Sequence, residues 1–304
     1  MSLNTNNDFN LTTSNLIFVQ SGFSIEQAFV DTLTENFNST PSSVDFKRRR
    51  QTVKKINDVV SQTTNGLIDK LLTDESVDPS TRLILVNAIH FKGDWKNKFN
   101  PNSTVKSDFQ LSNGTKIQTE MMNLKDNFEV AEIPQLAATA LRMPYSGDRL
   151  SMVVILPNKE TGLEKTEEAL ENFDLASIDF LGPEEVEVAL PKFKLQSDHK
   201  LVQTLKSLEV TSLFDAGRAN LTGISPERLT ISDVIQKAVL EVNEQGSEAA
   251  AATAVEFELR SIQFYPVGQF KCDRPFMYFI TDNLTGLTLF IGRVSNPNEK
   301  WSFS

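Results

Sequence analysis

Few side chains in this sequence are of the types that do chemistry at neutral pH. Its 304 residues include two histidines and a single cysteine, Cys272. His90 lies within an apolar run and His199 near an expected helix start, so a core or surface role is favoured over a catalytic or metal-binding one. The sequence has no G-x-S-x-G, H-E-x-x-H, G-x-G-x-x-G or C-x-x-C motif and no phosphate-binding loop. We therefore expect a protein that is not an enzyme and that uses no metal or cofactor.

One group of side chains could recognise a ligand by its charge. Six cations lie within nine consecutive positions of an amphipathic segment: Lys47, Arg48, Arg49, Arg50, Lys54 and Lys55. Such a cluster fits a polyanion, for example a sulphated glycan. It also fits the solvated face of an ordinary surface helix, which is the commoner case. The sequence leaves both interpretations open.

The overall composition restricts the partners and the compartment. A formal net charge of -10 and a pI of about 4.9 argue against nucleic acid as a partner. No run of about 18 apolar residues is present, so no membrane-spanning helix is expected. The first ten residues are polar and do not have the pattern of a signal peptide. One cysteine allows no internal disulfide and leaves the redox compartment open.

Asn-X-Ser/Thr triplets nevertheless suggest a secreted glycoprotein. They occur at Asn10, Asn38, Asn102, Asn113, Asn220 and Asn283. A chain rich in Asn, Ser and Thr also produces such triplets by chance. We expect an extracellular protein, with a cytoplasmic location as the alternative.

The segment 246–260 has the most informative pattern in the chain. Its second half alternates apolar and acidic residues, and the apolar ones are Val255, Phe257 and Leu259. This is the period of a half-buried strand. The residues that continue the apolar side backwards are small, so they could enter between existing strands without overpacking. A short Ala-rich surface helix is the alternative, because Ala is the best helix former.

The rest of the chain is a mixture of strand and helix patterns. Helical spacing occurs at 25–37, after the expected N-cap Ser24, and at 53–60, 163–175 and 201–208. Strand patterns occur at 16–19, 81–91, 109–111, 116–122, 141–145, 150–156, 186–193, 229–242, 276–280 and 287–294. No linker or repeat separates two domains. We expect one α+β domain over residues 1–304, with a poorly defined tail at 1–14.

Two of these patterns are especially specific. The run 81–91 is apolar enough to be buried on both faces, which predicts a central strand of a sheet. Asn113-Gly114, between two strand patterns, is a strong signal for a tight hairpin.

Seven segments also match a known family, in that family's order along the chain. They are Asn87–Trp95 (N-A-I-H-F-K-G-D-W), Leu141–Tyr145 (L-R-M-P-Y), Leu150–Pro157 (L-S-M-V-V-I-L-P), Leu190–Lys194 (L-P-K-F-K), Lys237–Thr253 (K-A-V-L-E-V-N-E-Q-G-S-E-A-A-A-A-T), Asp273–Phe276 (D-R-P-F) and Leu289–Pro297 (L-F-I-G-R-V-S-N-P). On these segments the chain closely resembles the serpins, a family of serine-protease inhibitors.

The resemblance implies a fold and a mechanism. The serpin fold has large mixed and antiparallel β-sheets, surrounding helices and an exposed reactive-centre loop, which corresponds here to 244–269. In serpins a protease cleaves this loop, the cut loop enters the main sheet as a new strand, and the protease is trapped covalently. The resemblance therefore implies a monomeric suicide-substrate inhibitor whose partner is a serine protease.

The resemblance also assigns roles to residues of the loop. The hinge consists of Glu244, Gly246, Ser247, Glu248, Ala249, Ala250, Ala251, Ala252 and Thr253. The reactive-centre bond is Arg260–Ser261, and Leu259, Glu258 and Phe257 tune selectivity. An arginine before the bond implies a trypsin-like protease, because such enzymes hold Arg or Lys in a pocket with an acid at its base.

Three residues outside the loop are expected to support its entry. Lys192 matches a position that commonly pairs with the residue at Glu244. Trp95 is expected to pack close by. Asn87 matches a buried polar position in the region that opens to admit the loop.

The small hinge residues favour an inhibitor, because proline or a large charged side chain would stall entry into the sheet. The alternative is a non-inhibitory serpin-like protein for binding or storage. The sequence departs from the family in two respects. Gln236 stands where vertebrate members usually have His, and 1–15 has no counterpart of the family's first helices.

Overall fold

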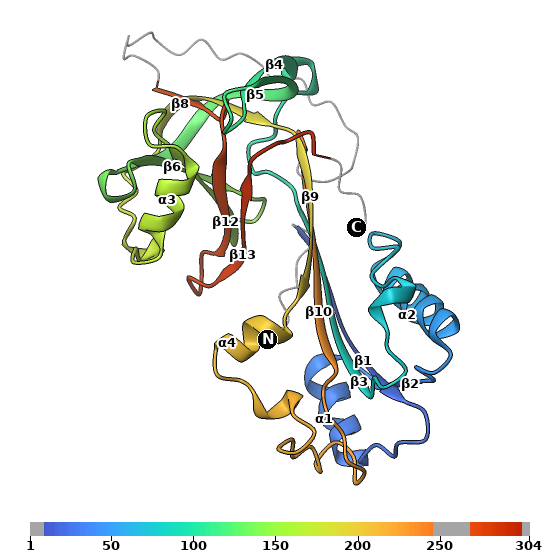
Figure 1. Ribbon diagram of the computed structural model, residues 1–304. Helices are drawn as coiled ribbons and strands as arrows, with labels where there is room; N and C mark the ends of the chain where they lie inside the picture. The colour runs from blue at the N-terminus through green and yellow to red at the C-terminus, as the bar shows by residue number, and fades with distance from the viewer. Residues whose placement is uncertain (1–8, 246–267, 300–304) are drawn as a thin grey trace. The chain divides into compact units, whose positions relative to one another are not determined.

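The structure is a computed structural model that describes residues 9–245 and 268–299 (Figure 1). The described residues form two compact units. Unit 1 contains 92–194, 241–245 and 268–299, together with Phe9 and Asn10, and unit 2 contains 11–91 and 195–240. Each unit has its own hydrophobic core.

The helices of the described chain are α1 (Gln27–Phe37), α2 (Arg49–Thr63), α3 (Leu163–Leu170) and α4 (Val202–Ser207). The strands are β1 (Phe9–Gln20), β2 (Ser42–Val44), β3 (Leu83–Gly93), β4 (Val105–Gln110), β5 (Lys116–Ile133), β6 (Ala138–Pro144), β7 (Leu150–Pro157), β8 (Glu184–Pro191), β9 (Phe193–Lys200), β10 (Asp233–Val242), β11 (Gly268–Lys271), β12 (Phe276–Asp282) and β13 (Thr288–Val294). These helices and β-sheets form an α+β fold, as expected from the sequence.

A five-stranded sheet dominates unit 2, with the order β2-β1-β3-β10-β9. The predicted central strand is confirmed, because β3 is the third of the five strands and none of its residues is exposed. Strands β3 and β10 run side by side in parallel, with Asn87 opposite Gln236 and Phe91 opposite Leu240 (Figure 1).

Helix α2 packs against this sheet through one apolar face. Val53, Ile56 and Val60 recur at helical spacing and are buried in one cluster with residues of β3 and β10, among them Val86 and Val239. The other side of α2 carries charged residues. The helix therefore joins the core by one face and leaves its cations in solvent.

The sheet of unit 1 has the order β11-β8-β5-β6-β7-β12-β13, with β4 paired to β5. Every residue of β7 is buried, because β6 and β12 flank it and an apolar cluster that includes Leu163 of α3 packs against the sheet. The expected hairpin joins β4 to β5, and Gly114 in its turn has φ +83°, which a glycine adopts without steric cost.

Several element ends differ from the sequence expectations. Helix α1 begins at Gln27 with Glu26 as its N-cap, so Ser24 lies two residues before the cap, where its backbone N–H donates to the Glu227 carboxylate at 3.2 Å. Helix α3 ends at Leu170 rather than 175, since Asp174 caps a separate short turn.

Three strands also have different bounds. β5 extends to Ile133, well beyond 122. β10 begins at Asp233 rather than 229, because Ile231 N–H donates to Leu213 O, outside the sheet. β1 begins at Phe9, so that part of the expected tail is a strand. No helix within 9–245 and 268–299 has the length and apolar character needed to cross a bilayer.

Candidate functional site

The last described residues before the predicted loop are fixed by backbone hydrogen bonds within unit 1. The backbone N–H of Trp95 donates to Gln245 O at 3.1 Å, and that of Phe99 donates to Glu244 O at 2.9 Å. The indole Nε1 of Trp95 donates to Asn243 O at 2.9 Å. Three consecutive carbonyl groups are thus held where the chain enters the predicted loop.

The side chain of Glu244 is held as firmly as its backbone. Oγ1 of Thr104 donates to Oε1 of Glu244 at 2.8 Å, and Nζ of Lys192 lies 3.2 Å from the same oxygen. Only 11% of the Glu244 side chain is exposed. The structure therefore brings together Lys192 and Glu244, the two residues that the resemblance paired.

The Glu244 carboxylate stays ionised because hydrogen bonding outweighs burial. Burial alone raises the pKa of a carboxyl group, since it disfavours the charged form. Hydrogen bonds from the backbone, from Thr104 and from Lys192, together with the charge of Lys192, act in the opposite direction and leave the pKa of Glu244 below its ordinary value. The ion pair is therefore complete at neutral pH.

Trp95 lies in an aromatic group beside these hydrogen bonds. Its side chain is 1% exposed. The ring stacks on Tyr145, with centroids 4.5 Å apart and an interplanar angle of 8°, and meets Phe99 edge-on at 6.3 Å. Stacked and edge-on aromatic pairs add stability beyond the area they bury. This group gives the hydrogen bonds to 243–245 a rigid support.

Charges of alternating sign continue from Glu244 along neighbouring strands. Nζ of Lys192 also lies 3.7 Å from a carboxylate oxygen of Glu120. Nζ of Lys194 lies 3.4 Å from Glu241. These pairs are more exposed than Glu244, so each contributes less to stability.

Asn87, the third supporting residue, lies in unit 2 at the pairing of β3 and β10. Its Nδ2 donates to Oδ1 of Asn15 at 2.9 Å, and its Oδ1 accepts from Nε2 of Gln236 at 3.2 Å. Gln236, where many family members have His, therefore still supplies a hydrogen bond to Asn87. The two amides bridge the central pair of strands.

The basic residues lie at the start of α2 in unit 2, and all six are exposed. Three have carboxylate partners: Arg48 with Asp45 (3.3 Å), Arg50 with Asp74 (3.5 Å) and Lys54 with Asp58 (2.6 Å).

The remaining predicted site residues lie outside the described residues. They are Gly246, Ser247, Glu248, Ala249, Ala250, Ala251, Ala252, Thr253, Phe257, Glu258, Leu259, Arg260 and Ser261. Their roles stay predictions.

Sequence reasoning missed three contacts of this site. Thr104 and Phe99 lie in no matched segment, and Tyr145 lies in one that did not indicate its contact with Trp95. Thr104 is 140 positions from Glu244 in the sequence. Such residues come together only in the folded chain.

The two histidines and the single cysteine, whose side chains are often used in catalysis or metal binding, do not gather into a site in the described residues. His90 is 1% exposed within β3, and His199 is exposed. Cys272 is fully buried, and burial raises the pKa of its thiol, which leaves it unreactive. In the described part of the chain, no three His, Cys, Asp or Glu side chains group as a metal site.

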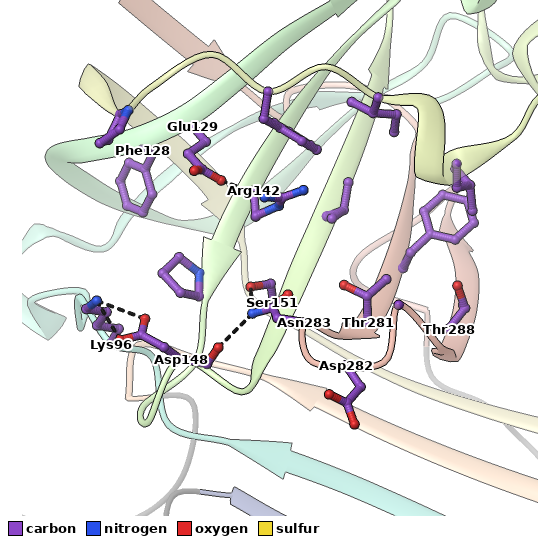
Figure 2. A pocket seen from close by; sticks show the side chains of 18 of the residues that line it. Lys96, Phe128, Glu129, Arg142, Asp148, Ser151, Thr281, Asp282, Asn283 and Thr288 are labelled. Atoms are coloured by element: carbon purple, nitrogen blue, oxygen red, sulfur yellow. Dashed lines mark hydrogen bonds and ion pairs between the residues drawn. The ribbon is translucent and has the colours of Figure 1, made fainter.

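A separate cavity of about 620 Å³ opens on the sheet of unit 1 (Figure 2). At one end Nζ of Lys96 donates to both carboxylate oxygens of Asp148 at 2.8 Å. Figure 2 shows Asn283 between Asp148 and Ser151, with its Nδ2 donating to Asp148 O and to Oγ of Ser151 at 2.8 Å. Deeper in, the Arg142 guanidinium pairs with a glutamate. Asp282, which also lines the cavity, pairs with Arg149 at 3.3 Å.

Comparison with known proteins decides the family. The family model described as Serpin (serine protease inhibitor) matches residues 1–297. This chain belongs to the serpin family. It is 36% identical to Serpin B6 of Macaca fascicularis over 297 residues, which is 96% of this chain and 78% of that protein. It is 37% identical to the human leukocyte elastase inhibitor over 299 residues, which is 94% of this chain and 78% of that protein.

Comparison with solved structures supports the same family assignment. The serpin described here superposes on Serpin48 of the insect Tenebrio molitor with a TM-score of 0.85 and 32% identity. The match covers 97% of this chain and 78% of that chain. Protease inhibition is the activity that these relationships support.

Proposed function

We propose that this serpin is a suicide-substrate inhibitor of a trypsin-like serine protease, cleaved at Arg260–Ser261. The serine of the protease attacks the Arg260 carbonyl, the peptide bond to Ser261 breaks, and the amine of Ser261 leaves with a proton. An ester between the protease and Arg260 remains. The hinge and loop then enter the sheet of unit 2 and carry the bound protease with them. The active site of the protease is distorted, so the ester is not hydrolysed.

The observation that carries this proposal is the fixed end of the loop. Residues 243–245 are held by Trp95, Phe99 and the Lys192–Glu244 ion pair. Because 243–245 are anchored, the cut loop would enter the sheet of unit 2 from its hinge end first. An anchored start also reduces the number of arrangements that the cut loop must give up on entering the sheet.

The energetics explain why small hinge residues matter. Burying Val255, Phe257 and Leu259 releases on the order of 5–9 kcal/mol. Ordering the loop costs roughly 1–2 kcal/mol for each residue, which is larger in total. Insertion therefore depends on new backbone hydrogen bonds to β3 and β10. A bulky residue that blocked these bonds would leave the cut loop outside.

Incubation with trypsin tests the proposal. We expect a covalent complex that survives boiling in detergent and whose mass is trypsin plus residues 1–260. The peptide 261–304 should be released on denaturation, which identifies the bond. Cleavage without any adduct would contradict the inhibitor assignment.

Two variants sharpen this experiment. Arg260→Ala should abolish the complex with trypsin, and Arg260→Lys should retain it, because trypsin-like pockets accept both basic side chains. Ala251→Glu should be cut at the same bond but give no adduct, since a charged side chain would have to enter the sheet. If Arg260→Ala inhibits trypsin as well as the parent, the bond is placed wrongly.

A non-inhibitory binding or storage protein is the competing function. It should gain little thermal stability on cleavage, whereas an inserting serpin should gain many degrees because a strand is added to its sheet.

The curated relatives support neither secretion nor glycosylation, and they fit the cytoplasmic alternative better. Fractionation of cells that make the protein, with an anti-serpin blot of the medium, would decide the location.

A further inference from the structure

We propose that a second cavity of unit 1 binds a phosphorylated polyol, a small molecule with two or more phosphate groups on a frame of hydroxyl-bearing carbons. This cavity, the α3 cavity, has a volume of about 540 Å³ and lies between the β4–β5 hairpin, the first turn of α3 and the chain from Lys271 to Pro275. Cavities of this size typically enclose a single small molecule. The inhibitor mechanism proposed above uses none of its residues.

The charges that line the α3 cavity are mostly positive. Its cationic side chains are Lys116, Lys159, Lys165, Lys271 and Arg274, and its carboxylates are Asp108, Glu164 and Asp273. The cavity therefore has an excess of two positive charges, in a chain whose formal net charge is -10. Such a local reversal of sign attracts anions.

Two of the three carboxylates are already held by cations of the cavity. Asp108 pairs with Lys116 at 3.2 Å. Asp273 accepts a hydrogen bond from Arg274 at 2.9 Å and lies 3.9 Å from Nζ of Lys159. These pairs leave other cations of the cavity for a ligand.

Lys165 and Lys271 are the cations that remain. Both are exposed, and neither forms an ion pair with another residue that the structure describes. Lys165 belongs to the first turn of α3, and Lys271 is the last residue of β11. Because the two ammonium groups reach the cavity from different elements, they suit a ligand with more than one phosphate.

Arg274 gives the cavity a cation of fixed orientation. Its Nε donates to Pro157 O at 2.8 Å and its Nη1 to a carboxylate oxygen of Asp273 at 2.9 Å. Its Nη2 makes no hydrogen bond with another described residue. A guanidinium held at two nitrogens loses little freedom when the third binds an anion, and its donors match the oxygens of a phosphate.

The start of α3 adds backbone donors to those cations. The first N–H groups of a helix have no intrahelical partner, and the helix dipole favours an anion beside them. The N-cap of α3 is Gly162, so no side chain satisfies these groups. A Cβ built on Gly162 would meet nothing within 4 Å, so the space beside the backbone is open. The helix start thus extends a site that cations of other elements define.

The lining also restricts the frame that carries the phosphates. Among the described residues that line the cavity none is aromatic, so a nucleobase would have no ring to stack on. Ser112, Asn158 and Thr161 instead offer hydroxyl and amide groups, which can both donate to and accept from the hydroxyls of a ligand. This combination favours a polyol over a nucleotide.

Calorimetric titration of the full chain with inositol trisphosphate, at about 100 mM salt so that exposed charges are only partly screened, tests the proposal. We expect one molecule to bind per chain. The variant Lys165→Gln/Lys271→Gln should lose about tenfold or more in affinity, because it removes the two cations without carboxylate partners.

Unit 2 offers a matched control. Lys54 and Lys55 are exposed on α2, and changing both to Gln alters the net charge by the same amount. This variant should bind within about twofold of the parent. A loss in the control as large as that in Lys165→Gln/Lys271→Gln would overturn the site, as would a failure of the parent to bind.

Glu164 allows a test of the opposite sign. It is an exposed carboxylate in the lining of the cavity, so Glu164→Gln should raise the affinity about threefold. Glu168 is exposed on the same helix outside the lining, and Glu168→Gln changes the net charge equally. It should leave the affinity almost unchanged. Equal gains in the two variants would contradict the site.

Two further probes test the class of ligand. Adenosine triphosphate carries as many phosphates as inositol trisphosphate and should bind more weakly, because its base finds no aromatic partner. Tighter binding of the nucleotide would overturn the polyol assignment. Vesicles that contain phosphorylated phosphatidylinositol distinguish a lipid headgroup from a free polyol. Vesicle binding that Lys165→Gln/Lys271→Gln abolishes would support the site, with a headgroup as the source of the ligand.

The proposal can fail independently of the inhibitor function. None of these variants changes 244–261, so complex formation with trypsin should be the same as for the parent. Loss of that complex in Lys165→Gln/Lys271→Gln would show that the substitutions disturb the fold, and would overturn their interpretation as ligand contacts.

Discussion

The two sheets of this serpin have very different interiors. In unit 1, β7 is buried along its whole length and, apart from Ser151, is apolar. In unit 2, the central pair β3 and β10 carries buried or half-buried polar groups at Asn87, His90, Gln236 and Lys237. A sheet built only to be stable would resemble the first.

The difference suggests a division of labour. Polar contacts between β3 and β10 are short and specific, and they can be exchanged for contacts with another strand. An apolar interior packed to crystal-like density cannot be rearranged so cheaply. Under the proposed mechanism the polar sheet is the one that opens. The apolar sheet is the scaffold that remains.

Gly292→Ala should produce the largest change in stability, because Gly292 lies in β13 of the sheet of unit 1. A Cβ at Gly292 would lie 2.3 Å from the Tyr278 hydroxyl oxygen and 2.6 Å from ring atom Cζ, on the adjacent strand. Tyr278 is only 5% exposed, so its ring would have to shift against neighbouring side chains. We expect a loss of about 3 kcal/mol or more in the free energy of unfolding, measured in urea.

A second glycine provides the control for this prediction. Gly268 also lies in a strand of unit 1, but its added Cβ would lie 3.9 Å from a side-chain atom of Val186 and 4.0 Å from Glu185 O, which are ordinary contact distances. Gly268→Ala should change stability by less than about 0.5 kcal/mol. A mild Gly292→Ala variant would show that the scaffold tolerates rearrangement and would weaken the contrast.

Lys237→Met should have a smaller effect of the opposite sign. Lys237 is 1% exposed, and its Nζ donates to Lys70 O at 2.6 Å and lies 3.1 Å from Asp198. The variant removes the buried cation, whereas Asp198, whose side chain is 50% exposed, can be solvated by water in its absence. We expect a gain of about 1–2 kcal/mol at pH 7, reduced by the lost bond to Lys70. The exposed Lys200→Met is the control.

The gain should depend on pH in a defined direction. Burial lowers the pKa of Lys237 from its ordinary value of 10.5, and Asp198 opposes this effect only in part. Between the two pKa values the unfolded chain binds more protons than the folded one, so the stability of the parent rises with pH there. The advantage of Lys237→Met should therefore shrink as the pH approaches 10.5. A constant advantage would mean that packing, not charge burial, is responsible.

Asn87→Ala should have the smallest effect. It removes the amide that joins Asn15 to Gln236. We expect a loss of about 1 kcal/mol, since the stranded amides are only partly buried and can turn to other partners. Urea unfolding measures this, and Asn15→Ala, which removes only one of the two bonds, should cost less. A loss above about 3 kcal/mol would show that the polar pairing is as rigid as the apolar sheet.

Strongly patterned elements could be predicted from the sequence. The run 81–91 gave the central strand, and Asn113-Gly114 gave the hairpin, because both signals are local. Helix ends could not be predicted as well. Ser24 has the side chain of an N-cap, yet α1 begins at Gln27 and its N-cap is Glu26, which makes no side-chain cap hydrogen bond.

The candidate site shows the same limit. The resemblance pointed to Lys192, Glu244 and Trp95, since they stand in recognisable segments. It gave no sign of Thr104, whose hydroxyl shares the Glu244 oxygen with Lys192. A threonine in an ordinary polar stretch has no pattern, and its role arises only when two segments distant in the sequence meet in the fold.

The indole of Trp95 makes this protein its own optical reporter. Its emission depends on the stacked Tyr145 and on the carbonyl that it donates to, and that carbonyl belongs to the residues just ahead of the predicted loop. The chain has one other tryptophan, Trp301. With Trp301→Phe, the fluorescence of a single native residue would show in real time whether and when 243–245 leave their resting arrangement, with no dye attached.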